Sequence, residues 1–384
     1  MGLNFNFSTA TQILFGNGTV AKVPELLNTY GRKIMLVTGK NSERAKPLTD
    51  LLSSTSEIFR FGVEKEPSVE VIDEGVKLAR KNHCEAIVGF GGGSVIDSAK
   101  AIAALTPNAG ELLDYLEVIG KGKKLTEKPL PFIAIPTTAG TGAEASKNSV
   151  IYSAKHKVKV SLRSSLMFAD VAVVDPELTL SMPSEITATT GMDALTHLLE
   201  TFVSNQANPF IDNFGREGMQ RVSRSLLKAY ETGSNLEARE DMAYAALLGG
   251  MALANVKLGA VHGFAGPMGG MIPIPHGAVC ARLLPAVMEA NLKSAKSQNL
   301  KYIISKYDEV AQLLTGESNA RSEEGVQWAQ QMVEKLNIPL LSAFGLTPDD
   351  FPVLVEKAKK ASSMKGNPVV LSDESLMLIL EKSI

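Results

Sequence analysis

The 384-residue sequence is short of cysteine, of net charge and of long apolar runs, and each shortage excludes a class of protein. Cys84 and Cys280 are too few for a disulfide framework and neither lies in a CxxC pair, so we expect a reducing compartment. The formal charge of -2 indicates neither a nucleic-acid nor an anionic-membrane partner. No apolar run reaches about 18 residues and no signal-peptide pattern opens the chain. We therefore predict a cytoplasmic protein that binds neither nucleic acid nor membrane.

Two kinds of pattern divide the chain near residue 183. A chain of this length is long for one hydrophobic core, so two domains are expected. Before the division, short apolar runs alternate with helical patterns, which predicts a Rossmann-like parallel sheet with helices on both faces. After it, segments rich in alanine, leucine and methionine predict helices alone. We predict an α/β domain over 1–183 and an all-α domain over 184–384, with strands at 33–39, 57–62, 85–90, 131–136 and 171–176.

Two glycine-rich loops follow predicted strands in the first domain. In EAIVGFGGGSVIDSAKAIA (85–103), three glycines precede Ser94, which we place at a helix N-cap. Such a turn brings backbone N–H groups close to a phosphate, although GxGxxG is absent. The second loop, in PFIAIPTTAGTGAEAS (131–146), carries the hydroxyl groups of Thr137, Thr138 and Thr141. Two loops of this kind favour a pyrophosphate-containing dinucleotide over the alternative of two ordinary turns.

Four side chains of the second domain are candidate metal ligands. Asp193 and His197 lie four residues apart in a predicted helix and so share a face, a spacing that surface ion pairs also use. His262 and His276 stand in the apolar stretch VHGFAGPMGGMIPIPHG, where a structural histidine is the simpler alternative. Together they offer one carboxylate and three imidazoles, which suit ferrous iron or zinc. An ion of this kind beside a dinucleotide indicates hydride transfer to or from an alcohol.

The sequence resembles the iron-containing (group III) alcohol dehydrogenases along almost its whole length. The resemblance lies in ILFGNGTVAKV (13–23), GGGSVIDSAKAIA (91–103), PTTAGTGAEAS (136–146), VDPELTLSMP (174–183), ATTGMDALTHLLE (188–200) and PHGAVCARLLP (275–285). It implies the two-domain fold of dehydroquinate synthase, a dinucleotide in the first domain and a metal in the second. It also implies NAD(P)(H), Fe²⁺ with Zn²⁺ as the alternative ion, a small alcohol or aldehyde substrate, and a homo-oligomer.

Carried over by position, the resemblance assigns residues to both sites. The implied metal ligands, through which catalysis proceeds, are Asp193, His197, His262 and His276. The implied cofactor-binding residues are Gly39, Gly92, Gly93, Ser94, Asp97, Thr137, Thr138, Thr141, Asn148, Lys159 and Leu178. Spacing alone describes Lys159 as part of a solvated basic strand, and its cofactor role is implied only by the resemblance.

The sequence departs from the family pattern at two positions. Members that prefer NAD have an aspartate where this chain has Gly39, and Lys40 follows it. A missing carboxylate and an added cation predict that NADP(H) is used at least as well as NAD(H). Many members also carry a histidine four residues after the third metal ligand, where this chain has Gly266. A proton path would then need water or another group.

Two other functions compete with hydride transfer. A metal-dependent cyclase or lyase of the dehydroquinate synthase type needs a basic cluster for its charged substrate, and the segments around the proposed ligands hold one lysine. A non-catalytic cofactor-binding relative is suggested only by Gly266. We also expect Phe264, Pro267 and Met268 either to line a small apolar substrate site or to pack between helices.

Overall fold

The computed structural model describes residues 4–384 and divides the chain into two compact units. The α/β unit comprises Ser8–Thr138 and Gly142–Thr179. The helical unit comprises Leu180–Ile384, Ala139–Thr141 and residues 4–7. Within residues 4–384, no helix combines the length and the apolarity needed to cross a bilayer.

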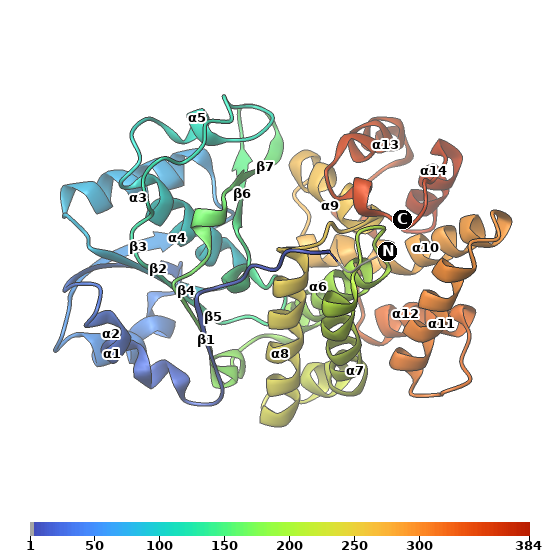
Figure 1. The fold of residues 1–384 in the computed structure, drawn as a ribbon, viewed down its shortest axis with the longest axis horizontal. Coiled ribbons are helices and arrows are strands. Elements are labelled where there is room, and N and C mark those ends of the chain that lie inside the picture. The colour runs from blue at the N-terminus through green and yellow to red at the C-terminus, as the bar shows by residue number, and fades with distance from the viewer. Residues whose placement is uncertain (1–3) are drawn as a thin grey trace. The chain divides into compact units, whose positions relative to one another are not determined.

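A six-stranded parallel sheet forms the centre of the α/β unit (Figure 1). Its strand order is β1-β8-β5-β4-β2-β3 and every neighbouring pair is parallel. The central strands are buried on both faces, which explains their unbroken apolar runs. The strands are β1 (Gln12–Phe15), β2 (Lys33–Gly39), β3 (Glu57–Val63), β4 (Ala86–Gly91), β5 (Phe132–Pro136) and β8 (Val171–Val174). The predicted parallel α/β architecture is confirmed.

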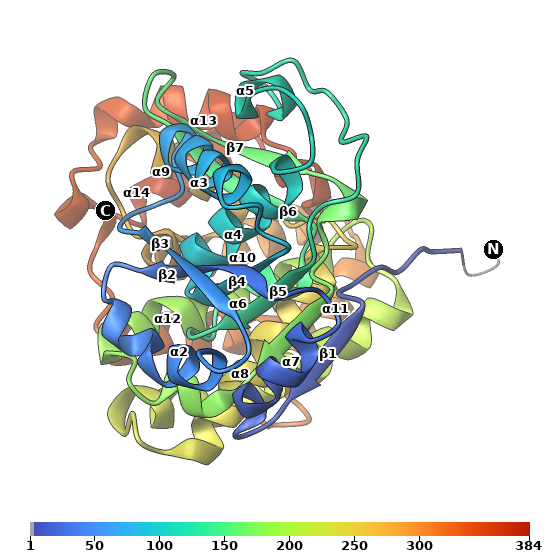
Figure 2. The same ribbon diagram turned by 90° about the vertical axis from the view of Figure 1, so that its left-hand side faces the viewer.

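Helices cover both faces of this sheet (Figure 2). On one face α3 (Val69–Lys81) and α4 (Gly93–Leu105) pack against alternate strand residues such as Met35 and Ile87. On the other face α1 (Val23–Leu27) and α2 (Lys46–Leu52) pack against the intervening residues. The unit is completed by α5 (Leu112–Tyr115), by an antiparallel hairpin of β6 (Asn148–Ser153) and β7 (Val158–Arg163), and by the 3₁₀ turns η1 (Thr19–Lys22), η2 (Ser42–Ala45), η3 (Ala143–Ala145), η4 (Ser165–Met167) and η5 (Pro176–Thr179).

The glycine-rich turn after β4 differs from the prediction in one respect. Helix α4 begins at Gly93, and Gly92, with φ -76° and ψ -174°, is its N-cap. Gly92 is extended and continues the path of the strand, so the helix begins two residues earlier than expected. The prediction that Ser94 is the N-cap is therefore wrong, because Ser94 is the second residue of the helix.

The helical unit is arranged around α6 (Ser184–Val203), which contacts α7, α8 and α10. Its residues are buried from Gly191 to Val203, so this part of the helix is surrounded by protein on all sides and has no solvent-exposed face. The other helices are α7 (Pro209–Glu231), α8 (Leu236–Leu253), α9 (Ala260–Met271), α10 (His276–Ser297), α11 (Lys301–Thr315), α12 (Ser322–Lys335), α13 (Phe351–Lys360) and α14 (Asp373–Glu381), with the 3₁₀ turns η6 (Leu341–Phe344), η7 (Pro348–Asp350) and η8 (Met364–Gly366). The predicted all-α architecture is confirmed.

Helix α10 approaches α6 very closely at its first turn. A Cβ atom added to Gly277 would lie 2.3 Å from the carbonyl oxygen of Thr189 on α6. Only glycine fits at that distance, so the glycine after His276 lets the start of α10 reach α6. Because Asp193 lies one turn further along α6, this approach brings His276 toward it.

Candidate functional site

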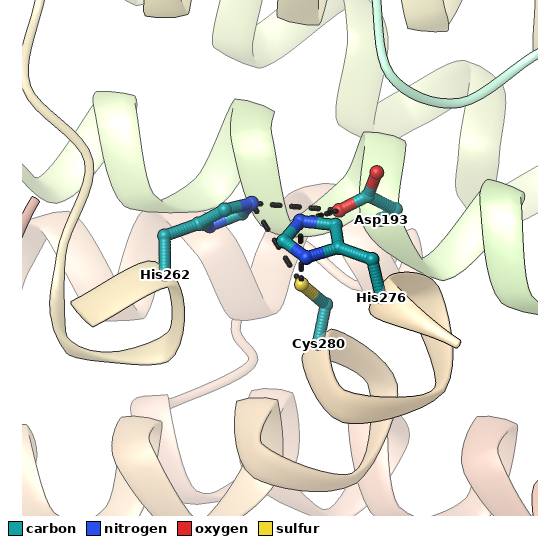
Figure 3. Close-up of side chains that lie close together, drawn as sticks. All are labelled: Asp193, His262, His276 and Cys280. Carbon is teal, nitrogen blue, oxygen red and sulfur yellow. Dashed lines mark hydrogen bonds and ion pairs between the residues drawn. The ribbon is translucent and has the colours of Figure 1, made fainter. Parts of the chain in front are cut away.

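Three imidazole nitrogens converge on one carboxylate oxygen in the helical unit. The Nε2 atoms of His197, His262 and His276 lie 3.8, 3.4 and 3.7 Å from Oδ1 of Asp193. Asp193 and His197 come from α6, His262 from the first turn of α9, and His276 from the first residue of α10. Figure 3 shows His262 and His276 directed toward Asp193. The structure thus brings together all four side chains that the sequence proposes as metal ligands.

The spacing and chemistry of this group fit a metal ion. Two nitrogen or oxygen ligands that share an ion at about 2.1 Å in a tetrahedral site lie about 3.4 Å apart, close to the observed separations. Oδ1 of Asp193 is buried and receives no hydrogen bond from the described residues. An acceptor left without a donor in a protein interior is costly unless a cation faces it. The donor set, three imidazoles and a carboxylate, suits iron or zinc.

Burial and mutual charge control the ionisation of these ligands. Burial lowers the pKa of His197 to about 4, against the opposing effect of the Asp193 charge. Its imidazole is therefore neutral at physiological pH, which is the form that binds a metal. Burial by itself raises the pKa of Asp193, but the surrounding imidazoles outweigh it and hold that pKa well below its usual range. Asp193 is accordingly a carboxylate at neutral pH.

Glu200 fixes the orientation of His262, and the sequence analysis missed it. Its Oε2 accepts a hydrogen bond from Nδ1 of His262 at 2.8 Å, and its Oε1 accepts one from the backbone N–H of Val261 at 2.7 Å. The side chain of Asn367 accepts the N–H of Ala260 at 3.1 Å, so two side chains cap the first turn of α9. With Nδ1 bound to Glu200, the Nε2 atom of His262 points at Asp193.

Cys280 is a further residue that the sequence analysis did not connect with the metal. Its Sγ atom lies 3.7 Å from Nε2 of His262 and 3.6 Å from Nε2 of His276. Ligand atoms of Asp193, His262, His276 and Cys280 all lie within 4.8 Å of one another. Figure 3 shows the thiol beside the two imidazoles. The signal in the sequence was the four-residue spacing from His276 to Cys280, which repeats that of Asp193 and His197.

In the α/β unit, several predicted cofactor residues meet where parallel strands end. Gly39 ends β2, Gly92 follows β4, and Thr137 and Thr138 follow β5. All four line one cavity together with Lys40, and Thr137 donates its backbone N–H to the carbonyl of Gly91 at 2.9 Å. The carboxyl edge of a parallel sheet is the usual place for a nucleotide. Gly93 and Ser94 continue from this cavity into the first turn of α4.

Asp97 and Asn148 are half-buried at the junction of α4 with the β6–β7 hairpin. The Asp97 carboxylate accepts the N–H of Val150 at 2.9 Å. Burial raises the pKa of Asp97 to about 6, against the opposing charge of Lys100. Lys100 is fully buried and donates to the carbonyl oxygens of Ala143, Ser146 and Asn148 at 2.7–2.9 Å. Lys100 therefore holds the threonine- and glycine-rich loop in place, although the sequence analysis assigned it no role.

The other proposed cofactor residues are not among the residues that line that cavity. The side chain of Lys159 is only 8% exposed and forms an ion pair of 2.5 Å with Glu66, so its description as part of a solvated strand is wrong. Leu178 lies in η5 and packs against the sheet face that α1 and α2 cover. Thr141 belongs by its contacts to the helical unit.

Of the two expectations for Phe264 and Met268, packing between helices agrees with the structure and lining an open substrate site does not. Phe264 has no exposed surface and neither has Met268, so both pack between helices and line no open site in this chain. Gly266 is half-buried, and a Cβ atom added there would meet no described atom within 4 Å. A larger side chain therefore fits at the position where a histidine is often expected.

Comparison with known proteins identifies the family. Residues 10–176 match the model of the iron-containing alcohol dehydrogenases, and residues 187–384 match that of the C-terminal domain of the same family. A crystal structure of a 1,3-propanediol oxidoreductase has a TM-score of 0.92 and 31% identity, with 100% of both chains covered.

Curated relatives agree with these matches. Alcohol dehydrogenase 4 of Saccharomyces cerevisiae is 37% identical over 318 residues, which are 83% of this chain and 80% of the relative. The NAD-dependent methanol dehydrogenase of Bacillus methanolicus is 32% identical, with 99% and 100% covered. The NADPH-dependent butanol dehydrogenase of Clostridium saccharobutylicum is 33% identical, with 98% and 97% covered. The chain therefore belongs to the iron-containing alcohol dehydrogenase family and is a metal-dependent, NAD(P)-dependent oxidoreductase of alcohols.

Proposed function

We propose that Asp193, His197, His262 and His276 hold the catalytic divalent ion, and that the enzyme interconverts small, weakly polar alcohols and aldehydes. The observation that carries this assignment is the convergence of three Nε2 atoms on the unpartnered Oδ1 of Asp193. Two buried carboxylates, those of Asp193 and Glu200, support a divalent ion, because their charges together balance it.

Each residue of the cluster has a separate task in this proposal. When bound, the ion polarises an alcohol or carbonyl oxygen and lowers the pKa of an alcohol. Asp193 supplies the one negative charge among the four proposed ligands. Glu200 holds the proton of His262 on Nδ1, which leaves Nε2 free to bind. Gly266 has no side chain to carry a proton, so a proton path from the alcohol would need water or another group.

The α/β unit binds the dinucleotide at the carboxyl edge of its sheet in this proposal, with a preference for NADP(H). The cavity there is lined by Gly39 with Lys40 and Arg44, and none of its described lining residues is acidic. Two cations suit a 2′-phosphate, and a carboxylate that would repel it is missing. Lys40 also pairs with Glu64 at 3.7 Å, but both side chains are exposed, so this pair is weak.

The decisive experiment measures metal content and turnover together. We expect purified protein loaded with Fe²⁺ or Zn²⁺ to oxidise NADPH in the presence of short-chain aldehydes, with kcat/KM for NADPH at least equal to that for NADH. The His276→Ala variant should lose both bound metal and activity. His156→Ala, which removes an exposed histidine of the α/β unit, is the matched control.

Three results would each contradict a part of the proposal. Retained metal and activity in His276→Ala would refute the ligand assignment, and no turnover across a broad aldehyde panel would refute the substrate class. A kcat/KM for NADPH far below that for NADH would refute the cofactor preference alone. The homo-oligomeric state and the cytoplasmic location stay predictions, and light scattering of the purified protein tests the first.

A further inference from the structure

Helix α9, which carries His262 in its first turn, begins without a capping side chain of its own. Its N-cap is Gly259, which has no side chain that could bind the first N–H groups of the helix. The N–H of Ala260 is bound instead by Oδ1 of Asn367 at 3.1 Å, and the carboxylate of Glu200 binds the next N–H. Acceptors from outside the helix therefore decide where its first turn lies.

The glycine at this helix end is required by the two acceptors. A Cβ atom added to Gly259 would lie 2.7 Å from Oε1 of Glu200 and 3.0 Å from Oδ1 of Asn367, so a side chain there would displace them. Both acceptors are buried, with exposed fractions of 3% for Glu200 and 5% for Asn367. The bare backbone of Gly259 thus lets a carboxylate and an amide from distant segments reach the same end of α9.

A second amide holds Asn367 in one orientation. Nδ2 of Asn367 donates to Oδ1 of Asn291 on α10 at 2.7 Å and to the carbonyl oxygen of Val369 at 2.8 Å. Nδ2 of Asn291 donates back to Oδ1 of Asn367 at 3.2 Å and also to the hydroxyl group of Tyr307 at 3.0 Å. Because Nδ2 of Asn367 faces two carbonyl oxygens, the acceptor Oδ1 is the atom that faces the N–H of Ala260. This network ties the start of α9 to α10.

We propose that Asn367 is a positioning residue of the metal site, which together with Asn291 holds the first turn of α9 so that His262 reaches the ion. The inference rests on the proposed metal ligands. Asn367 acts through the backbone of α9, whereas Glu200 also binds the imidazole of His262. An amide suits this place better than a carboxylate, because it accepts the N–H without adding a second buried negative charge beside Glu200.

The experiment compares two asparagines of the full-length protein that hold the same segment. Asn367→Ala removes the bond to α9. Asn205→Ala is the matched control, because Nδ2 of Asn205 donates to the carbonyl oxygens of Lys365 and Asn367, and within residues 4–384 it has no bond to α9. Affinity for Zn²⁺, measured by chelator competition, should fall about 10-fold in Asn367→Ala and stay unchanged in Asn205→Ala.

Two further measurements distinguish positioning from general stability. Amide hydrogen exchange of the segment 259–262 in the metal-free protein should become faster in Asn367→Ala and not in Asn205→Ala, because only the first change frees an N–H of α9. Asn291→Ala should weaken Zn²⁺ binding as Asn367→Ala does. The double variant should lose little more than either single variant, because the two amides act as one pair.

The possible results distinguish this inference from the metal site itself. An unchanged Zn²⁺ affinity in Asn367→Ala overturns the role of Asn367 and leaves the metal site intact. An equal loss in Asn205→Ala also overturns it, because the effect would then be one of general stability. If Asn367→Ala does not fold, Asn367→Ser, which leaves a smaller gap, decides by the same comparison. Failure of the wild type to bind Zn²⁺ overturns the proposed metal site and this inference together.

Discussion

The two candidate sites of this protein are built in opposite ways. The metal cluster consists of side chains from α6, α9 and α10, and Asp193 is only 3% exposed. The cofactor edge consists largely of backbone at the ends of β2, β4 and β5, with glycines at Gly39 and Gly92. A cluster of buried side chains depends on every donor and on the residues that orient it. A backbone site tolerates changes of side chain unless these add charge or bulk.

The largest effect is expected from Asp193→Asn, which breaks the side-chain site alone. Removing the one charged member of the proposed ligand set should weaken metal binding about 1,000-fold, because breaking a buried charge pair costs roughly 3–5 kcal/mol. The metal-dependent rise in Tm should vanish, while NADPH binding to the metal-free protein stays unchanged. Calorimetry measures both, with Asp349→Asn, at an exposed site, as the control. Equal metal affinity in the two variants would contradict the assignment.

A smaller effect is expected from Glu200→Gln, which tests the orientation of His262. The amide keeps the shape of the side chain but weakens its hold on Nδ1, so metal affinity should fall about 10- to 100-fold. Chelator competition measures this change. Glu185→Gln, on an exposed part of the same helix, is the control and should leave metal affinity as it is. An unchanged affinity in Glu200→Gln would show that His262 needs no carboxylate partner.

Gly39→Asp tests the cofactor edge instead of the metal cluster, because it adds a negative charge where this edge has only backbone. A Cβ atom at Gly39 meets nothing within 4 Å, so the aspartate fits. Its charge should lower the ratio of kcat/KM for NADPH to that for NADH by about 10-fold, without a change in metal content. Gly39→Asn has the same shape without the charge and should keep the ratio. A ratio that moves equally in both variants would point to shape instead of charge.

The smallest effect concerns the pH dependence of stability. Burial raises the pKa of Asp97 from 3.8 to about 6, so the folded chain holds this proton more tightly than the unfolded chain. The contribution of this proton to the free energy of unfolding is fully present below pH 3.8 and is lost as the pH rises through about 6. Between pH 4 and 6 the free energy of unfolding should therefore fall by on the order of 1 kcal/mol less in Asp97→Asn than in the wild type. Urea unfolding at each pH measures this difference. Parallel pH profiles for variant and wild type would contradict the buried state of Asp97.

The degree of burial explains which strands the sequence could predict. The strand at 33–39 was found with its observed bounds because both of its faces are buried and its apolar run is unbroken. The edge strand Gln12–Phe15 was missed, since it is short and partly exposed. The hairpin strand Val158–Arg163 was recognised only as a basic strand around Lys159, and its pairing with Asn148–Ser153 was not predicted. Periodicity is strong only where burial is nearly complete.

Spacing along the chain predicted only those site residues that are neighbours on one helix, and it could not predict partners that the fold brings together from distant segments. The four-residue spacing of Asp193 and His197 was enough to propose ligands that share a helix face. Glu200 could not be found in this way, because its partner His262 lies 62 residues later in the chain. The N-cap at Gly92 was missed for a different reason, since three consecutive glycines leave the start of a helix undefined.

The pairing of the first strand with the last also bears on how the chain folds during translation. Among residues 4–384, strand β1 pairs with β8 alone, and β8 also pairs with β5. Until Val171–Val174 has left the ribosome, β1 has no neighbour and one edge of β5 is open. Closure of the sheet is thus a late, long-range event, which slows folding. A nascent or truncated chain that ends before Val171 will expose these strand edges and should need protection from aggregation.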